Sequence, residues 1–102
     1  METSIFLERL YTDLKALGLV ASQYDFSEMC GRTPAWFSTL KARRLPMTTD
    51  AALTLSHNIR QRASQLVDVS QYQAAMALSD TLITQAQQRI AHKLTIKEGL
   101  LG

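Results

Sequence analysis

The sequence predicts an all-α fold, and three observations support this prediction. Glycine occurs only four times and proline only twice in 102 residues. Asn-Gly turns and alternating β-branched runs, which are typical of strands, are missing. Apolar residues instead recur at spacings of three and four, which place them on one face of a helix. With 46% hydrophobic residues, a chain of this length is expected to form one domain with a modest core.

The first helix is predicted over residues 3–17. Its apolar side chains share one stripe, made of Phe6, Leu7, Leu10, Tyr11, Leu14 and Leu17. Gly18 follows the stripe, and glycine is the residue that most often ends a helix. This segment is therefore expected to be an amphipathic helix with one buried face.

A short second helix is predicted over residues 22–30. The Ser22 hydroxyl can accept hydrogen bonds from the backbone N–H groups of its first turn. Asp25 adds a carboxylate to the same turn, where the helix dipole favours negative charge. Gly31 is expected to end the helix.

The third helix is predicted over residues 34–42. Thr33 followed by Pro34 is typical of a helix start, with threonine as the capping residue and proline at the first helical position. Proline fits there because its missing N–H would have no intrahelical partner in any case.

A fourth helix is predicted to start at Thr48 and Asp50. Pro46 disfavours helical conformation at Leu45 before it. The inner side of this helix is expected to carry Ala52, Leu55 and Ile59.

The C-terminal part, residues 64–102, is predicted to hold one long helix from about Ser70 to Leu94. Such a helix spans about 37 Å. Residues of the kind found in a coiled-coil seam recur along it, namely Tyr72, Met76, Ser79, Ile83, Ala86 and Ile90. Because two or three heptads do not demand a coiled coil, two arrangements remain open. The helix either pairs with a second copy through Tyr72, Met76, Ile83 and Ile90, or packs back on the first helix.

Composition favours some classes of function and disfavours others. The net charge of +2 permits contact with polyanions without requiring it. The single cysteine, Cys30, excludes an internal disulfide and indicates a reducing compartment, so a cytoplasmic location is expected. No secretory signal is recognised at the N-terminus, and no segment approaches the 18 apolar residues of a membrane span. We therefore expect no membrane partner.

Catalytic chemistry is not expected from these residues. The flanks of Cys30 are typical of a small core thiol, and neither His57 nor His92 lies in a catalytic motif. The sequence contains no glycine-rich phosphate loop and no histidine pair with metal-ligand spacing. An enzyme, a cofactor and a metal site are therefore not predicted.

Residues 22–42 satisfy the requirements of a helix-turn-helix. This motif needs a short positioning helix, a tight turn near a glycine, and a second helix that can enter a major groove about 12 Å wide. Over roughly residues 5–60 the sequence resembles the Cro and lambda-repressor-like helix-turn-helix family. The matching positions are Ser22, Gln23, Phe26, Ser27, Cys30, Gly31, Thr33, Phe37, Leu40, Thr48, Ala52, Leu55 and Ile59.

The resemblance implies both a fold and a function. The fold is a four-helix N-terminal lambda-repressor-like bundle over residues 1–63, followed by the long C-terminal helix, with 22–30 as positioning helix and 34–42 as recognition helix. The function is that of a small transcriptional regulator that binds double-stranded DNA, expected here as a homodimer. Its half-sites would lie about one helical turn apart.

Three positions depart from the family pattern. Arg32 stands where a buried Val or Ile is usual, so its side chain must turn outward or lie along the surface. Arg43 replaces the glycine that usually ends the recognition helix. Met47 stands where the family has proline, with Pro46 one residue early. The turn after the recognition helix is therefore expected to be altered.

The DNA-binding side chains are expected to be short or cationic. The candidate residues are Gln23, Arg32, Thr33, Ala35, Ser38, Thr39, Lys41, Arg43 and Arg44. Since none of the residues in the first turns of the recognition helix can make bidentate base contacts, direct readout is expected to be weak, with Gln23 and the cations contacting phosphates. For the cations the alternative is a solvated loop.

An alternative function is a helix-turn-helix-derived module that binds another regulator rather than DNA. The contact would then involve Trp36, Phe37 or the long helix. Trp36 is expected to pack on the core, and an exposed Trp36 would favour this alternative.

Overall fold

Five α-helices make up the chain in the computed structural model, which describes the backbone of residues 3–101 and the side chains of residues 6–91. The helices are α1 (Thr3–Ala16), α2 (Gln23–Met29), α3 (Trp36–Arg43), α4 (Thr49–Ala63) and α5 (Val69–Leu101). No strand occurs in residues 3–101, which confirms the all-α class. None of the helices there combines the length and hydropathy needed to cross a membrane.

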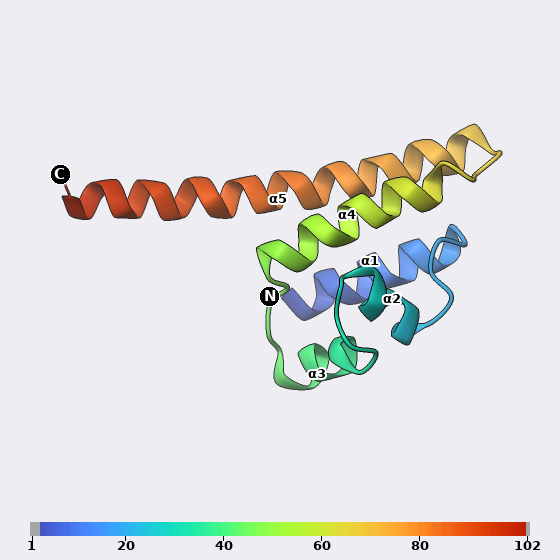
Figure 1. Cartoon of the computed structure of the whole chain (residues 1–102), viewed down its shortest axis with the longest axis horizontal. Coiled ribbons are helices and arrows are strands. Elements are labelled where there is room, and N and C mark those ends of the chain that lie inside the picture. Colours follow the sequence, from blue (N-terminus) through green and yellow to red (C-terminus); the bar gives the residue numbers. More distant parts are fainter. Residues whose placement is uncertain (1–2, 102) are drawn as a thin grey trace.

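The helices are arranged around α4. Figure 1 shows α5 running antiparallel to α4 at one side of the molecule, with α1 and α2 on the other side of α4. Helix α3 lies farthest from α5 (Figure 1). Helices α5 and α3 therefore lie on opposite sides of the molecule.

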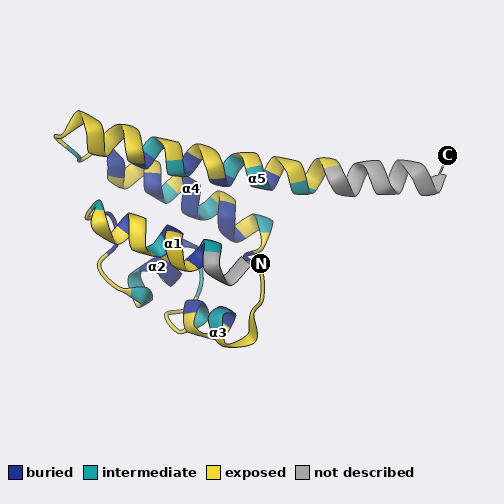
Figure 2. Cartoon of the chain, turned by 180° about the vertical axis from the view of Figure 1, so that it is seen from behind, coloured by how far each residue is buried: buried dark blue, intermediate teal, exposed yellow. Residues whose placement is uncertain are grey.

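The core joins α1, α2, α3 and α4 through aromatic and aliphatic side chains. The ring centroids of Phe26 and Phe37 lie 4.7 Å apart, and Tyr11 lies 5.7 Å from Phe26 and 5.4 Å from Phe37. Leu7, Leu10 and Leu14 are buried, which confirms the predicted inner stripe of the first helix. Buried positions lie on the inner sides of the helices in Figure 2. Each large apolar side chain buried in this way contributes about 1.5–3 kcal/mol.

Three helices end in the same hydrogen-bonded motif. The residue after each helix, or shortly after it, has a positive φ, with values of 76° at Gly18, 75° at Gly31 and 54° at Arg44. The following N–H groups, of Leu19, Arg32 and Leu45, donate 3.0 Å hydrogen bonds to the carbonyls of Leu14, Ser27 and Leu40. This is the Schellman arrangement, in which glycine is preferred because it has no Cβ. The predicted ends at Gly18 and Gly31 are confirmed.

The start of α2 is capped as predicted. Ser22 Oγ accepts the Asp25 N–H at 3.2 Å, and Asp25 Oδ2 accepts the Ala21 N–H at 2.9 Å. Arg62 of α4 donates hydrogen bonds of 2.8 and 3.0 Å to the two carboxylate oxygens of Asp25, and a third of 2.9 Å to the Leu19 carbonyl. The Arg62 hydrogen bonds hold the pKa of Asp25 below its usual value. This ion pair ties α4 to the start of α2.

Helix α4 also starts where the sequence predicts. Thr48 Oγ1 accepts the Ala51 N–H at 3.1 Å. Ala52, Leu55 and Ile59 are buried on its inner side.

Helix α5 is longer than the predicted segment and packs along α4. Among the side chains of α5 that the structure describes, the buried ones are Ala75, Ser79, Leu82 and Ala86. Ser79 Oγ lies 2.6 Å from Ser56 Oγ of α4. Of the two arrangements left open, α5 uses neither as its main contact: it lies along α4 (Figure 1) and borders the first helix only across a groove lined by Asp13, Ala16, Leu17, Ala74, Ala77 and Leu78. Small side chains on the buried seam allow α4 and α5 to approach closely. Of the predicted seam, Ser79 and Ala86 face α4, whereas Tyr72, Met76, Ile83 and Ile90 are half-buried or exposed.

Candidate nucleic-acid interface

Helix α3 begins at Trp36, two residues later than predicted. The Thr33 carbonyl accepts the Trp36 N–H at 3.0 Å, so Pro34 and Ala35 form a turn before the helix. The prediction that the Thr33 side chain caps the helix is wrong. A neighbouring helix supplies the cap, because Ser27 Oγ of α2 accepts the Phe37 N–H at 3.0 Å in the interior.

The inner side of α3 is anchored by the two predicted apolar residues. Phe37 and Leu40 are buried, and Trp36 is partly buried against the core. The expectation that Trp36 packs is confirmed. Together with the Ser27 hydrogen bond, these contacts fix the orientation of α3 on α2.

The outer side of α3 is made of short, exposed side chains. Ser38 and Thr39 of the helix are exposed, as are Thr33 and Ala35 before it; the long side chain of Arg43, the last residue of α3, is exposed as well. Ser38 Oγ donates a 3.4 Å hydrogen bond to Gln23 Oε1, and Thr39 Oγ1 donates a 3.1 Å bond to the Ala35 carbonyl. Both hydroxyl protons are therefore engaged, so the outward oxygen lone pairs remain as acceptors and the Gln23 amide nitrogen as a donor.

A shallow hollow lies where the start of α2 meets α3. Its lining residues are Ser22, Gln23, Tyr24 and Ser38. Tyr24 is 64% exposed and was not among the predicted site residues. Its position between capping Ser22 and buried Phe26 in a short helix is the sequence signal that points it outward.

Two of the four predicted cations are used within the fold. Arg32 donates a 3.1 Å hydrogen bond to Thr48 Oγ1 and lies 3.6 Å from Asp50 Oδ2, so it supports the start of α4. The Lys41 ammonium lies 4.6 Å from the centroid of the Phe37 ring, a cation–π contact. Both side chains therefore have less freedom to reach a ligand than their sequence positions indicate.

Arg43 and Arg44 remain exposed at the end of α3. Neither side chain makes an ion pair or hydrogen bond with a described residue. Arg44 is the only non-glycine residue with positive φ in the described part of the chain. Since this conformation costs an L-residue roughly 1–2 kcal/mol, the position combines an unfavourable backbone with an exposed positive charge.

Cys30, the cysteine beside this region, is inaccessible to reactants because it is buried. Cys30 is fully buried, and burial raises the pKa of its thiol to about 12. Its interpretation as a core thiol is confirmed.

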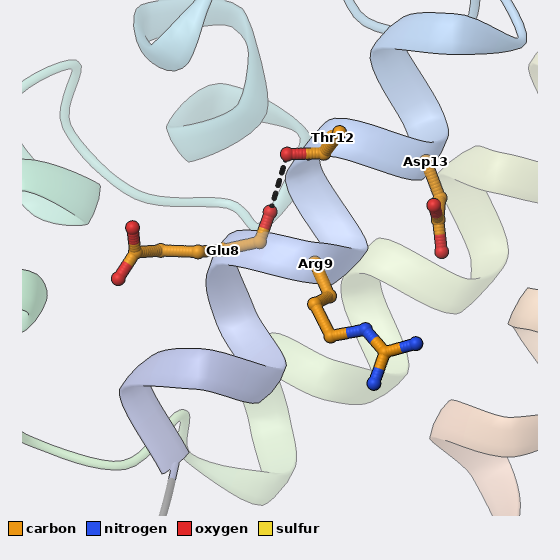
Figure 3. Close-up of a pocket in the computed structure, with 4 residues that line it drawn as sticks. All are labelled: Glu8, Arg9, Thr12 and Asp13. Carbon is orange, nitrogen blue, oxygen red and sulfur yellow. Dashed lines mark hydrogen bonds between the residues drawn. The ribbon is translucent and has the colours of Figure 1, made fainter.

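A second hollow, on α1, has a different character. It is lined by Glu8, Arg9, Thr12 and Asp13, and Thr12 Oγ1 donates a 2.9 Å hydrogen bond to the Glu8 carbonyl. In Figure 3 the Glu8 and Asp13 carboxylates point in different directions. With two carboxylates and one guanidinium, this hollow has the wrong charge for a polyanion. Nowhere among the described side chains do three potential metal ligands of the His, Cys, Asp or Glu type gather.

Comparison with known proteins identifies one family. The model of a family described as "Family of unknown function (DUF6626)" matches residues 7–98, nearly the whole chain. No curated protein and no solved structure gives a match.

Proposed function

The chain belongs to the DUF6626 family, a family of unknown function, and we propose that it is a small DNA-binding transcriptional regulator. In this proposal α2, the turn at Gly31 and α3 act as a helix-turn-helix, as the resemblance to the Cro and lambda-repressor-like family implies. The observation that carries the proposal is the placement of α3. Its inner side is anchored at Phe37 and Leu40, while its outer side is exposed at one end of the molecule (Figure 1).

The short outer side chains favour close approach to a major groove. Ala35, Ser38 and Thr39 add little bulk, so the helix backbone can lie deep in a groove about 12 Å wide. Hydroxyl lone pairs accept hydrogen bonds from the amino groups of adenine or cytosine, and methyl groups contact thymine. Direct base readout of this kind is weak, and most of the affinity would come from the phosphates.

Phosphate contacts are available at both ends of α3. Gln23 and Tyr24 border the hollow at one end, and Arg43 and Arg44 are exposed at the other. Cations and amide donors that flank a groove-entering helix fix its position on the duplex without reading sequence.

A homodimer is part of the proposal. Tyr72, Met76, Ile83 and Ile90 of α5 are half-buried or exposed and would pair with a second copy. The two α3 helices would then bind half-sites about 34 Å apart.

The alternative proposal is a protein-interaction module derived from the same fold. Two observations favour it. The outward residues of α3 before Arg43 include no Arg, Asn or Gln that could read a base. The Arg32 and Lys41 side chains contact Thr48 and the Phe37 ring within the chain. In this case α3 or α5 binds another regulator and DNA is not contacted.

Fluorescence anisotropy with labelled duplexes made from pooled genomic fragments separates the two proposals. The double substitution of Arg43 and Arg44 by Ala should weaken binding at low salt by about tenfold or more. It should also reduce the slope of log affinity against log salt by about two per bound chain. Arg9→Ala, which removes an exposed cation from α1, is the control and should leave affinity nearly unchanged.

No binding to any fragment at low salt would contradict the DNA-binding proposal. Equal losses in the Arg9 and Arg43/Arg44 variants would contradict the proposed interface.

A further inference from the structure

Arg89 of α5 contacts the connection between α3 and α4. Its guanidinium donates a hydrogen bond from Nη1 to the Met47 carbonyl, 42 residues earlier in the chain. The two can meet because α5 runs antiparallel to α4 and continues past the point where α4 starts (Figure 1). Arg89 follows buried Ala86 by three residues and buried Leu82 by seven, so it lies on the side of α5 that faces α4. The contact therefore links the C-terminal helix to the segment that follows α3.

The connection between α3 and α4, residues 44–48, is held at few other points. At its start the Leu45 N–H donates a hydrogen bond back to α3, and at its end Thr48 caps α4. Between these two ends the Met47 side chain is buried. Among the described residues, the bond from Arg89 is the hydrogen bond that reaches the backbone there. Arg89 and the buried Met47 side chain thus fix the middle of the connection.

Charge alone does not explain the position of Arg89. Its half-buried side chain forms no ion pair with a described carboxylate. It lies beside the start of α4, where the helix dipole disfavours a positive charge. A guanidinium can reach the carbonyl because its N–H donors stand at the tip of a long side chain. The hydrogen bond to Met47 is therefore the interaction that places this cation here.

The same connection begins at the residue with an unfavourable backbone conformation. Arg44 has φ 54° and ψ 40°, in the left-handed region. Conformations of this kind persist where the surrounding structure holds them. Because Met47 lies only three residues after Arg44, a fixed Met47 restricts the paths that the chain can take through Arg44. The bond from Arg89 thus helps to keep Arg44 in its conformation at the end of α3.

We infer that Arg89 is a positioning residue for DNA binding, which holds the α3–α4 connection in the conformation that presents Arg43 and Arg44 to the DNA backbone. The inference rests on the proposed function, in which these two arginines contact phosphates. Arg89 acts through the connection and touches no DNA itself. A connection that is ordered before DNA arrives lowers the entropy loss on binding. The long helix therefore contributes to DNA affinity within a single chain, separately from any pairing of two copies.

Fluorescence anisotropy with labelled duplexes, measured across a salt series, tests the inference. Arg89→Ala should lower DNA affinity by about three- to tenfold, the effect of losing one hydrogen bond that holds the connection. The slope of log affinity against log salt should stay unchanged, because no phosphate contact is lost. A slope lower by about one would mean that Arg89 itself touches a phosphate, and would overturn the positioning role. Unchanged affinity in Arg89→Ala would overturn it as well.

Two further variants separate positioning from charge and stability. Arg89→Lys keeps a long side chain with a charged donor, so its affinity should stay within about twofold of the wild type. Arg60→Ala is the matched control, because Arg60 is also a cation that joins α4 to α5, through Ser79 and Asp80, and makes no hydrogen bond to the connection. Its affinity should be nearly unchanged, with both proteins folded by circular dichroism at the assay temperature. Equal losses in Arg60→Ala and Arg89→Ala would contradict the inference.

A measurement without DNA keeps this inference separate from the proposed function. Backbone amide order parameters from NMR relaxation should be about 0.85 at Leu45, Met47 and Thr48 in the wild type, and lower in Arg89→Ala but not in Arg60→Ala. Unchanged order parameters would overturn the positioning role and leave the proposed function standing. A wild type that binds no DNA, although its connection loosens in Arg89→Ala, would contradict the proposed function and with it the role of Arg89 in DNA binding.

Discussion

Replacing Arg44 by glycine should make the protein more stable and weaken its binding to DNA. Arg44 occupies the position that Gly18 and Gly31 occupy after the first two helices, with φ 54° and ψ 40°. Arg44→Gly removes the steric conflict of its Cβ at this position. It also removes one of the two exposed cations at the end of α3.

The expected gain in stability follows from two opposing effects. Relief of the left-handed conformation contributes roughly 1–2 kcal/mol. Glycine adds about 0.4–1 kcal/mol of conformational entropy to the unfolded chain, which opposes the gain. The net increase in the free energy of unfolding is therefore about 0.5–1 kcal/mol near the middle of the two ranges, or about 2–8 °C in Tm for a domain of this size.

Urea and thermal unfolding followed by circular dichroism measure this change, and Arg43→Gly is the charge-matched control. Arg43 is the last residue of α3, where glycine should lower the free energy of unfolding by up to about 1 kcal/mol. Gly18→Ala calibrates the backbone cost alone, because a Cβ there would meet nothing within 4 Å. A loss of stability in Arg44→Gly, or equal changes in the two arginine variants, would refute the reasoning about backbone strain.

Two further predictions concern contacts that hold the helices together. Ser27→Ala leaves the buried Phe37 N–H without its acceptor and should lower the free energy of unfolding, measured by urea titration, by about 1–3 kcal/mol. The control, Ser38→Ala at an exposed position, should change it by less than about 0.5 kcal/mol. Arg62 lowers the pKa of Asp25 in the folded state. Ionised Asp25 therefore stabilises the fold at pH values above its ordinary pKa of about 4. This contribution is lost as the pH falls through the lowered pKa of the folded state. Unfolding free energies measured from pH 6 to pH 2 should therefore fall less steeply for Asp25→Asn than for the wild type, and parallel curves would contradict this assignment.

Local signals in the sequence are sufficient for most helix boundaries. Ser22 and Thr48 cap their own helices, and Gly18 ends α1 through its own backbone conformation. In each case the deciding hydrogen bonds join residues within one helical turn or so. Such elements can be predicted because neighbouring residues determine them.

The missed features depend on residues far apart in the chain. The start of α3 is set by Ser27, ten residues before Phe37, so the Thr33–Pro34 signal is overridden by tertiary structure. Lys41 lies over the ring of Phe37, four residues before it in α3, and this local contact could have been found from helical spacing. Arg32 carries the right charge for phosphates, but its position depends on Thr48, which is 16 residues away in the chain. Periodicity alone does not reveal such partners.

The face of α5 that meets α4 was also hard to predict. Large apolar residues dominate a hydropathy pattern, whereas Ala75, Ser79 and Ala86 make the buried seam together with Leu82. Small residues are selected there by the close approach of two helices, which only the folded chain defines. The large residues Tyr72 and Ile83 consequently lie outside this seam, where Tyr72 is exposed and Ile83 half-buried.

Mapping the DNA-contacting surface by NMR tests the central claim most directly. Amide proton–nitrogen correlation spectra of the labelled protein would be recorded during titration with a mixed-sequence duplex at low salt. The account predicts shifts concentrated at residues 22–24 and 33–45, including Gln23, Ser38, Arg43 and Arg44, which reverse as salt is added. Unchanged spectra, or shifts confined to α1 or α5, would contradict it.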